Sequence, residues 1–130
     1  MALGGTNFKL RSSTSLDPYA ALEFTAATGY TAGQMMKLAD TVGVVATTVT
    51  SGNQVVLVYQ AARILVPCVA ITSGNLGSMS VGDKVYFDAA DAEVNPDSSG
   101  NTLCGIVLET PSAGDETILI HLMGCLGIVA

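Results

Sequence analysis

The sequence contains few charged side chains and no tryptophan. Charged residues make up 12% of its 130 residues, against roughly 25% in typical globular domains, while apolar residues make up 49%. Serine, threonine, glycine and alanine stand in place of the missing charges. A small rigid β protein would have this composition, and so would a protein whose surface is largely covered by partners. We favour the second interpretation.

Basic side chains are scarce and unevenly placed. Five Lys and Arg face eleven Asp and Glu, a net charge of −6. Lys9 and Arg11 give the first 16 residues a charge of +2 with no acid, whereas the chain from Asp17 onward carries −8. Binding to nucleic acid through phosphates needs clustered Lys and Arg, so we expect no nucleic-acid partner. The basic segment either pairs with acidic groups on a protein neighbour or is a solvated terminus.

Cysteine and histidine are too few to form a metal centre or a disulfide framework. Cys68, Cys104 and Cys125 are an odd number and include no Cys-x-x-Cys pair, so at least one thiol is unpaired. A zinc site would need all three together with the lone His121. We expect buried free thiols that pack as small hydrophobes, with no metal and no cofactor.

The remaining polar residues do not form a catalytic motif. Asp88, Asp91, Glu93 and Asp97 lack the spacing of a calcium-binding loop, and we expect solvated turn residues, with a weak divalent-cation contact at a subunit boundary as the alternative. Alternation places His121 on the face of its strand that carries Leu119, opposite Ile120 and Leu122. The chain has no phosphate-binding Gly-x-x-x-x-Gly-Lys-Ser/Thr loop. We therefore expect no enzyme.

The sequence predicts neither a secretory signal nor a membrane span. Its first 15 residues lack the apolar core of a signal peptide. The longest strongly apolar run, 64–71, contains Pro67 and is far shorter than the ~20 residues of a spanning helix. We expect synthesis in the cytoplasm and no membrane partner.

The sequence predicts an all-β fold. Loose alternation predicts a strand at 19–25, and β-branched residues predict another at 42–49. Strands are also predicted at 54–59 and 63–71, and residues 34–38 form a strand or a short helical turn. Ser51-Gly52-Asn53 is a tight turn, and Pro67 belongs at an edge or a bulge because it cannot donate a main-chain hydrogen bond.

Residues 81–124 predict an antiparallel meander. Apolar runs at 85–87, 103–108 and 117–123 are separated by Gly, Asp, Ser, Asn and Pro at intervals of about ten residues. Together with the earlier strands, this predicts a compact antiparallel β-barrel or sandwich of about eight short strands at 20–130. An extended N-terminal arm at 1–19 precedes it.

Two pieces of the meander are distinctive, Gly-Asp-Lys-Val-Tyr at 82–86 and the stretch from Gly-Ile-Val at 105–107 to Gly-Asp-Glu-Thr at 114–117. With a weaker match upstream to about residue 31, they resemble the capsid cement, or head-decoration, proteins of tailed phages. This family was formerly catalogued as a domain of unknown function, and some members carry a recombinase label. A recombinase of that class would need the phosphate-binding loop that this chain lacks.

The resemblance implies a structural virion protein that binds the exterior of the mature phage capsid and cements it. The implied partners are the major capsid protein and further copies of the chain, as a homotrimer or a dimer. The alternative is a virion-displayed domain that binds a host surface or a carbohydrate. The residues expected to contact the capsid lie in the arm: Asn7, Phe8, Lys9, Leu10 and Arg11.

Overall fold

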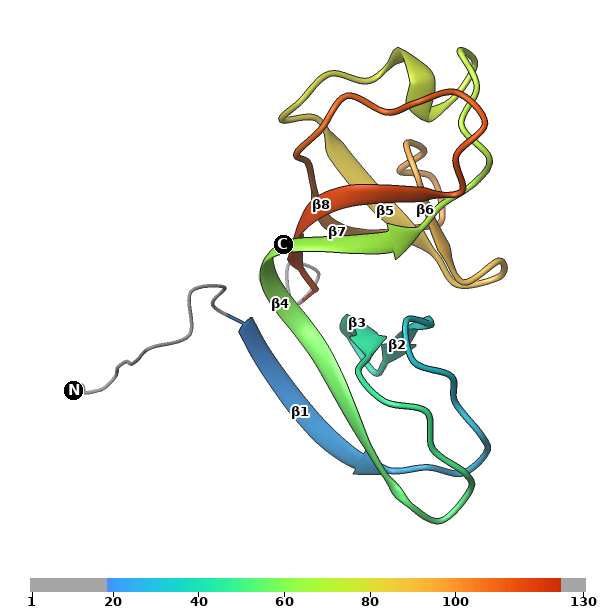
Figure 1. Ribbon diagram of the computed structural model, residues 1–130, viewed down its shortest axis with the longest axis vertical. Coiled ribbons are helices and arrows are strands. Elements are labelled where there is room, and N and C mark those ends of the chain that lie inside the picture. Colours follow the sequence, from blue (N-terminus) through green and yellow to red (C-terminus); the bar gives the residue numbers. More distant parts are fainter. Residues whose placement is uncertain (1–18, 125–130) are drawn as a thin grey trace, which may run out of the picture.

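The computed structural model describes residues 19–124, and the regular structure within them is β apart from one short 3₁₀ turn at Leu76–Ser78 (Figure 1). No helix in this part of the chain is long and apolar enough to cross a membrane. The eight strands are β1 (Tyr19–Thr25), β2 (Met35–Leu38), β3 (Thr41–Val45), β4 (Gln54–Pro67), β5 (Lys84–Asp88), β6 (Glu93–Asn95), β7 (Thr102–Val107) and β8 (Thr117–Met123). The predicted all-β class is confirmed.

Strand β4 connects the two parts of the molecule. Its first half pairs on one side with β1 and on the other with β3. Its second half leaves β3 and pairs with β8 instead. In Figure 1, β4 therefore runs from the lower hairpins, which contain β1 to β3, into the upper part, which contains β5 to β8.

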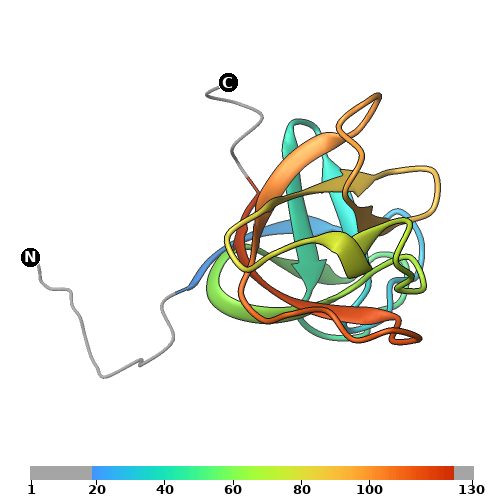
Figure 2. The ribbon, with the colours of Figure 1, turned by 90° about the horizontal axis from the view of Figure 1, so that it is seen from above.

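The upper part is a nearly closed barrel. Its strands follow the order β4-β8-β7-β5-β6, each antiparallel to the next. The ring returns to β4 through a single parallel bridge between Cys68 and Val94, where the Val69 N–H donates to the Val94 carbonyl at 3.2 Å. Seen from above, these strands curve around a common centre (Figure 2). Of the two predicted architectures, the barrel is the one that forms.

Two hydrophobic clusters lie on opposite faces of β3. Val42 and Val44 belong to the large cluster inside the barrel, and Val45 belongs to a smaller cluster under β1. A strand buried on both faces is expected to be an apolar run without alternation, as the Thr-Val-Gly-Val-Val sequence of β3 is. Gly43 is required there, because a Cβ atom would lie 2.6 Å from Leu57 Cγ and 2.8 Å from the Val58 carbonyl oxygen.

Several predicted boundaries were wrong. Strand β3 ends at Val45, not Val49, because residues 46–48 are exposed, so the β-branched side chains of Thr47 and Thr48 gain no burial there. The strands predicted at 54–59 and 63–71 are one continuous strand that ends at Pro67, with an irregularity between Ala61 and Ile64. Strand β6 was not predicted. The strands at 19–25 and 117–123 and the turn at 51–53 are confirmed.

Strand β1 begins at Tyr19, the last residue of the predicted arm. The rest of that arm and residues 125–130 lie outside the described residues.

Candidate interaction surface

The outward face of the barrel over β4, β8 and β7 exposes apolar side chains. On β8, Ile118, Ile120 and Leu122 point into the core and are buried, while Leu119 and His121 alternate with them and are half-buried. The pairing places Leu65 beside Leu119, and Ile106 beside His121. Leu65 is 61% exposed, one of the three most exposed large apolar side chains among residues 19–124.

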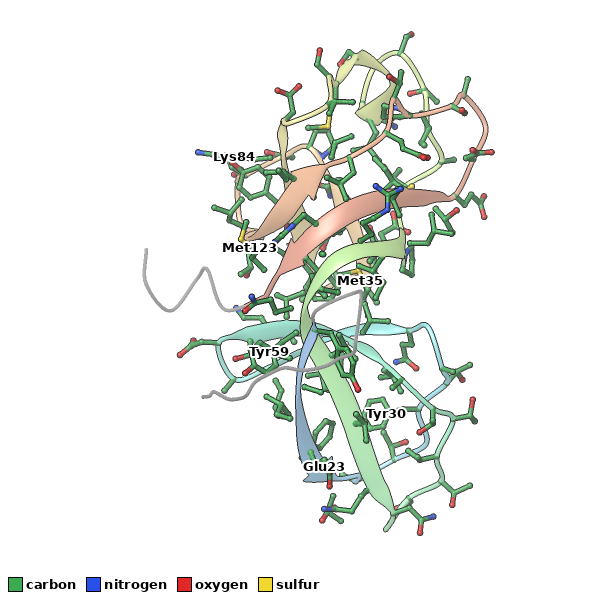
Figure 3. The ribbon with its side chains drawn as sticks, turned by 60° about the vertical axis from the view of Figure 1, so that its left-hand side comes forward. Glu23, Tyr30, Met35, Tyr59, Lys84 and Met123 are labelled. Carbon is green, nitrogen blue, oxygen red and sulfur yellow. The ribbon has the colours of Figure 1, made fainter. Side chains whose placement is uncertain are left out.

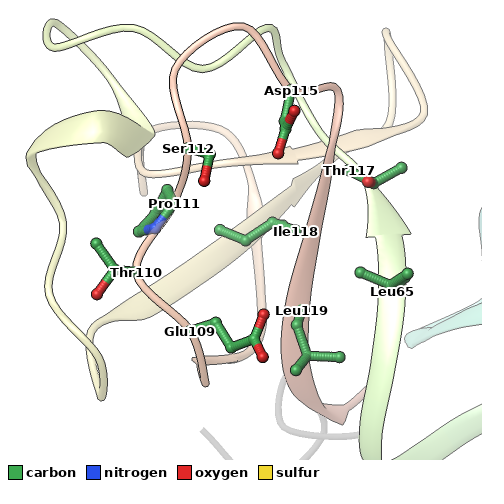
Figure 4. Close-up of a pocket in the computed structure, with 9 residues that line it drawn as sticks. All are labelled: Leu65, Glu109, Thr110, Pro111, Ser112, Asp115, Thr117, Ile118 and Leu119. Atoms are coloured by element: carbon green, nitrogen blue, oxygen red, sulfur yellow. The ribbon is translucent and has the colours of Figure 1, made fainter.

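A small hollow lies at one end of this face, between β8 and the loop that follows β7 (Figure 4). Leu65, Ile118 and Leu119 form its apolar side. The loop contributes the carboxylates of Glu109 and Asp115, and the remaining lining residues are Thr110, Pro111, Ser112 and Thr117. Its volume of about 100 Å³ is well below the roughly 300–1,000 Å³ of a typical small-molecule site. The hollow therefore fits one side chain of a partner rather than a substrate.

The charge around the hollow is mostly uncompensated. Arg63 Nη2 lies 3.9 Å from Glu109 Oε2, and both side chains are more than half exposed, so the pair contributes at most about 1 kcal/mol to stability. Residues 19–124 carry ten carboxylates and three basic side chains, a formal charge of −7, and the Arg63–Glu109 pair is the one salt bridge among them. Lys84 extends from the upper part of the molecule (Figure 3) and lies outside the hollow.

The described cysteines are structural. Cys68 and Cys104 are buried free thiols, as predicted. Burial raises the pKa of the Cys104 thiol to about 12. Burial, with the nearby negative charges of Glu93, Asp115 and Glu116, raises the pKa of Cys68 to about 11. Because the thiolate is the reactive form, both groups are poor nucleophiles at neutral pH. Cys125 lies outside the described residues.

The four predicted turn carboxylates lie at or beyond the end of β5, around the β5–β6 hairpin. Asp91 and Asp97 are exposed, and Asp88 and Glu93 are half-buried. Burial raises the pKa of Glu93, and the charges of Asp91, Asp88 and Glu116 add to the effect. In the described part of the chain, no group of three or more Asp, Glu, His or Cys side chains is arranged to hold a metal ion.

The tyrosines do not form a carbohydrate-binding platform in this structure. Tyr59 lies on β4 and Tyr86 lies on β5. Tyr30 follows β1 and packs its ring edge-on against Phe24, with 5.9 Å between the two ring centroids. Figure 3 shows Tyr30 and Tyr59 at separate places on the lower part. Nothing in this arrangement supports the alternative of a carbohydrate-binding domain.

The sequence did not reveal the apolar outward face. The prediction that His121 shares a strand face with Leu119 was correct. Leu65, however, lies in the run Arg63-Ile64-Leu65-Val66-Pro67, where inward and outward residues are both apolar, so the sequence does not show which of them point outward. The arm residues expected to contact the capsid, 7–11, lie outside the described residues, so their contacts stay a prediction.

Comparison with known proteins identifies the family. A model of the phage cement protein family matches residues 16–122, which covers the barrel up to the next-to-last residue of β8 and all but the last two described residues. No curated protein matches the chain, and no solved structure does. The family is a structural one and not a class of enzyme, and it implies association with the capsid of a phage virion. The chain belongs to the phage cement protein family.

Proposed function

We propose that this protein binds the outer surface of the mature phage capsid and stabilises the shell. The observation that carries the proposal is the family match over residues 16–122. The surface supports it, because an exposed apolar face and a side-chain-sized hollow suit a protein partner better than a substrate.

The mechanism is clamping. A protein that bridges neighbouring capsid subunits buries surface on each of them, and rupture of the shell must expose that surface again. A stable contact buries about 800 Å² on each partner, so even one such contact per subunit adds to the work of rupture. Capsid expansion creates the bridging sites, and the protein therefore binds the mature shell and opposes the pressure of packaged DNA.

The partners in this mechanism are the major capsid protein and further copies of the chain. A homotrimer suits a site shared by symmetry-related capsid subunits, and a dimer is the second choice. The body of the protein, residues 19–124, carries a formal charge of −7. This charge disfavours contact with nucleic acid and favours contact with basic protein surfaces. The arm residues 7–11 contribute to attachment, either to the capsid or to a neighbouring copy.

The experiment is a titration of purified mature shells that lack the protein. Bound protein per shell is measured, and particle survival is then scored after heating, chelation or osmotic shock. Survival should rise with occupancy and stop rising at a fixed number of copies per shell. Protection at far fewer copies than sites would indicate catalysis, and saturable binding without protection would leave attachment but remove the stabilising role.

A further inference from the structure

Among residues 19–124, no strand pairs with one side of β4 between the positions of β1 and β6. Strand β1 pairs with β4 up to Ala61, and on the same side β6 touches it next at Cys68. Across Ile64–Pro67, β4 pairs only with β8, on its opposite side, among the described strands.

The main chain of β4 is oriented for pairing at this gap. The Cys68 N–H donates to the main-chain carbonyl of Glu116, on the β8 side, and the Val69 N–H donates to the main-chain carbonyl of Val94, on the β6 side. Because these directions alternate along a strand, the N–H and C=O groups of Leu65 point into the gap, and Pro67, which has no N–H, points the same way. The gap therefore offers a short, specific stretch of backbone that no described strand pairs with and that an added segment can pair with.

The side chains beside this edge define what can bind. The exposed Leu65 separates the edge from the hollow, which Glu109 lines at one end and Asp115 at the other (Figure 4). Neighbouring strands are about 4.8 Å apart, so a Lys or Arg on an added segment is long enough to lie across Leu65 on β4 and to point toward the hollow. Its aliphatic stem would cover Leu65, and its cationic group would face the acidic hollow that Glu109 and Asp115 line.

One segment of the chain has this chemistry. Phe8-Lys9-Leu10-Arg11 alternates apolar and basic residues and contributes all the positive charge of the first 16 residues. From Asp17 onward, the chain carries −8. Direct contact between two such bodies brings like charges together, whereas contact between this segment and the body of another copy brings opposite charges together.

We infer that residues 7–11 of one copy bind the open edge of β4 and the adjoining hollow of a second copy, with Lys9 or Arg11 at Glu109 and Asp115. The inference rests on the proposed homo-oligomer and names the contact that holds it together. The contact joins two different surfaces and so runs head to tail, which closes into a ring when the rotation allows it.

The first test uses full-length charge variants and measures oligomeric state by sedimentation over a range of protein concentrations. Lys9→Glu with Arg11→Glu, and Glu109→Lys with Asp115→Lys, should each convert the oligomer to a monomer. A chain that carries all four changes should recover the oligomer, because the charges are complementary again. The matched control is Glu23→Lys with Asp40→Lys, which changes net charge as much as the Glu109 and Asp115 pair at exposed positions away from the hollow and should remain oligomeric.

The second test separates contact between copies from contact within one chain. A variant with Lys9→Gln and Arg11→Gln is mixed with a variant that carries Glu109→Gln and Asp115→Asn. The mixture should form a one-to-one heterodimer, because one intact segment meets one intact hollow.

Three results would overturn the inference: a wild-type monomer at every soluble concentration, charge variants that keep the wild-type oligomer, or variants that lose thermal stability while the mixture stays monomeric. The last of these would show that the segment binds its own body. Failure of the proposed function looks different, because wild-type protein would then leave shell survival unchanged whatever its oligomeric state.

Discussion

The same substitution at two neighbouring positions on β4 should have very different effects on the free energy of unfolding. Leu65 points outward and is 61% exposed, whereas Val66 points into the barrel and is 0% exposed. Leu65→Asp places a carboxylate in water, so the free energy of unfolding should change by no more than about 0.5 kcal/mol. Val66→Asp loses about 1.5–3 kcal/mol of burial and forces an unpaired charge into the core at a further cost of several kcal/mol. That total approaches the roughly 5–15 kcal/mol that holds a domain folded.

The two variants should also differ in function. If Leu65 lies at the centre of an interface, its removal should cost about 2 kcal/mol of binding, which is a roughly 30-fold weaker affinity for shells. Denaturant unfolding measures the first quantity, and a shell-binding isotherm measures the second. Leu65→Asp should be folded and weakly bound, and Val66→Asp should be largely unfolded. A Leu65→Asp protein that binds shells at full strength would refute a role of this face in attachment to the capsid.

Three further predictions follow from the same structure. Deletion of residues 1–16 should leave the circular dichroism spectrum and melting temperature nearly unchanged but should weaken or abolish shell binding, and full-strength binding by the truncated protein would remove the arm from the mechanism. Glu93→Gln should stabilise the protein more at pH 7 than at pH 4. The raised pKa of Glu93 in the folded state favours folding at low pH, and this contribution to stability is lost as the pH rises through the folded-state pKa. Equal melting-temperature shifts at both pH values would contradict this prediction. Shell protection should survive individual substitution of the polar residues of types that catalysts and metal sites use: His121, Asp88, Asp91, Glu93 and Asp97. Loss of protection by folded variants across this set would argue for an active site.

The sequence predicted the fold class because alternation and turn residues act locally. Ile118, Ile120 and Leu122 alternate with Leu119 and His121, and that pattern alone placed β8 and its inward face correctly. The total of eight strands was also right, but through two errors that cancelled. Strand β4 was divided in two, and the three-residue β6 was missed, because Glu93 and Asn95 carry no strand signal and Val94 is held by β5 and the bridge to Cys68.

Long-range packing explains what the sequence could not predict. Ile106 belongs to the apolar run 103–108, whose composition suggests a core position, yet Ile106 is half-buried on the outward face beside His121. Ile106→Asp should therefore be milder than a change at the fully buried Val85. The hollow likewise depends on how the loop at 109–115 folds against β8, and no local pattern encodes that arrangement.

The shell-stabilising role is tested most directly by particle survival as a function of the number of copies bound per shell. The account predicts that survival under heat or osmotic shock rises in proportion to occupancy and saturates at a fixed stoichiometry. Full occupancy with no gain in survival, or full protection at a small fraction of occupancy, would contradict it.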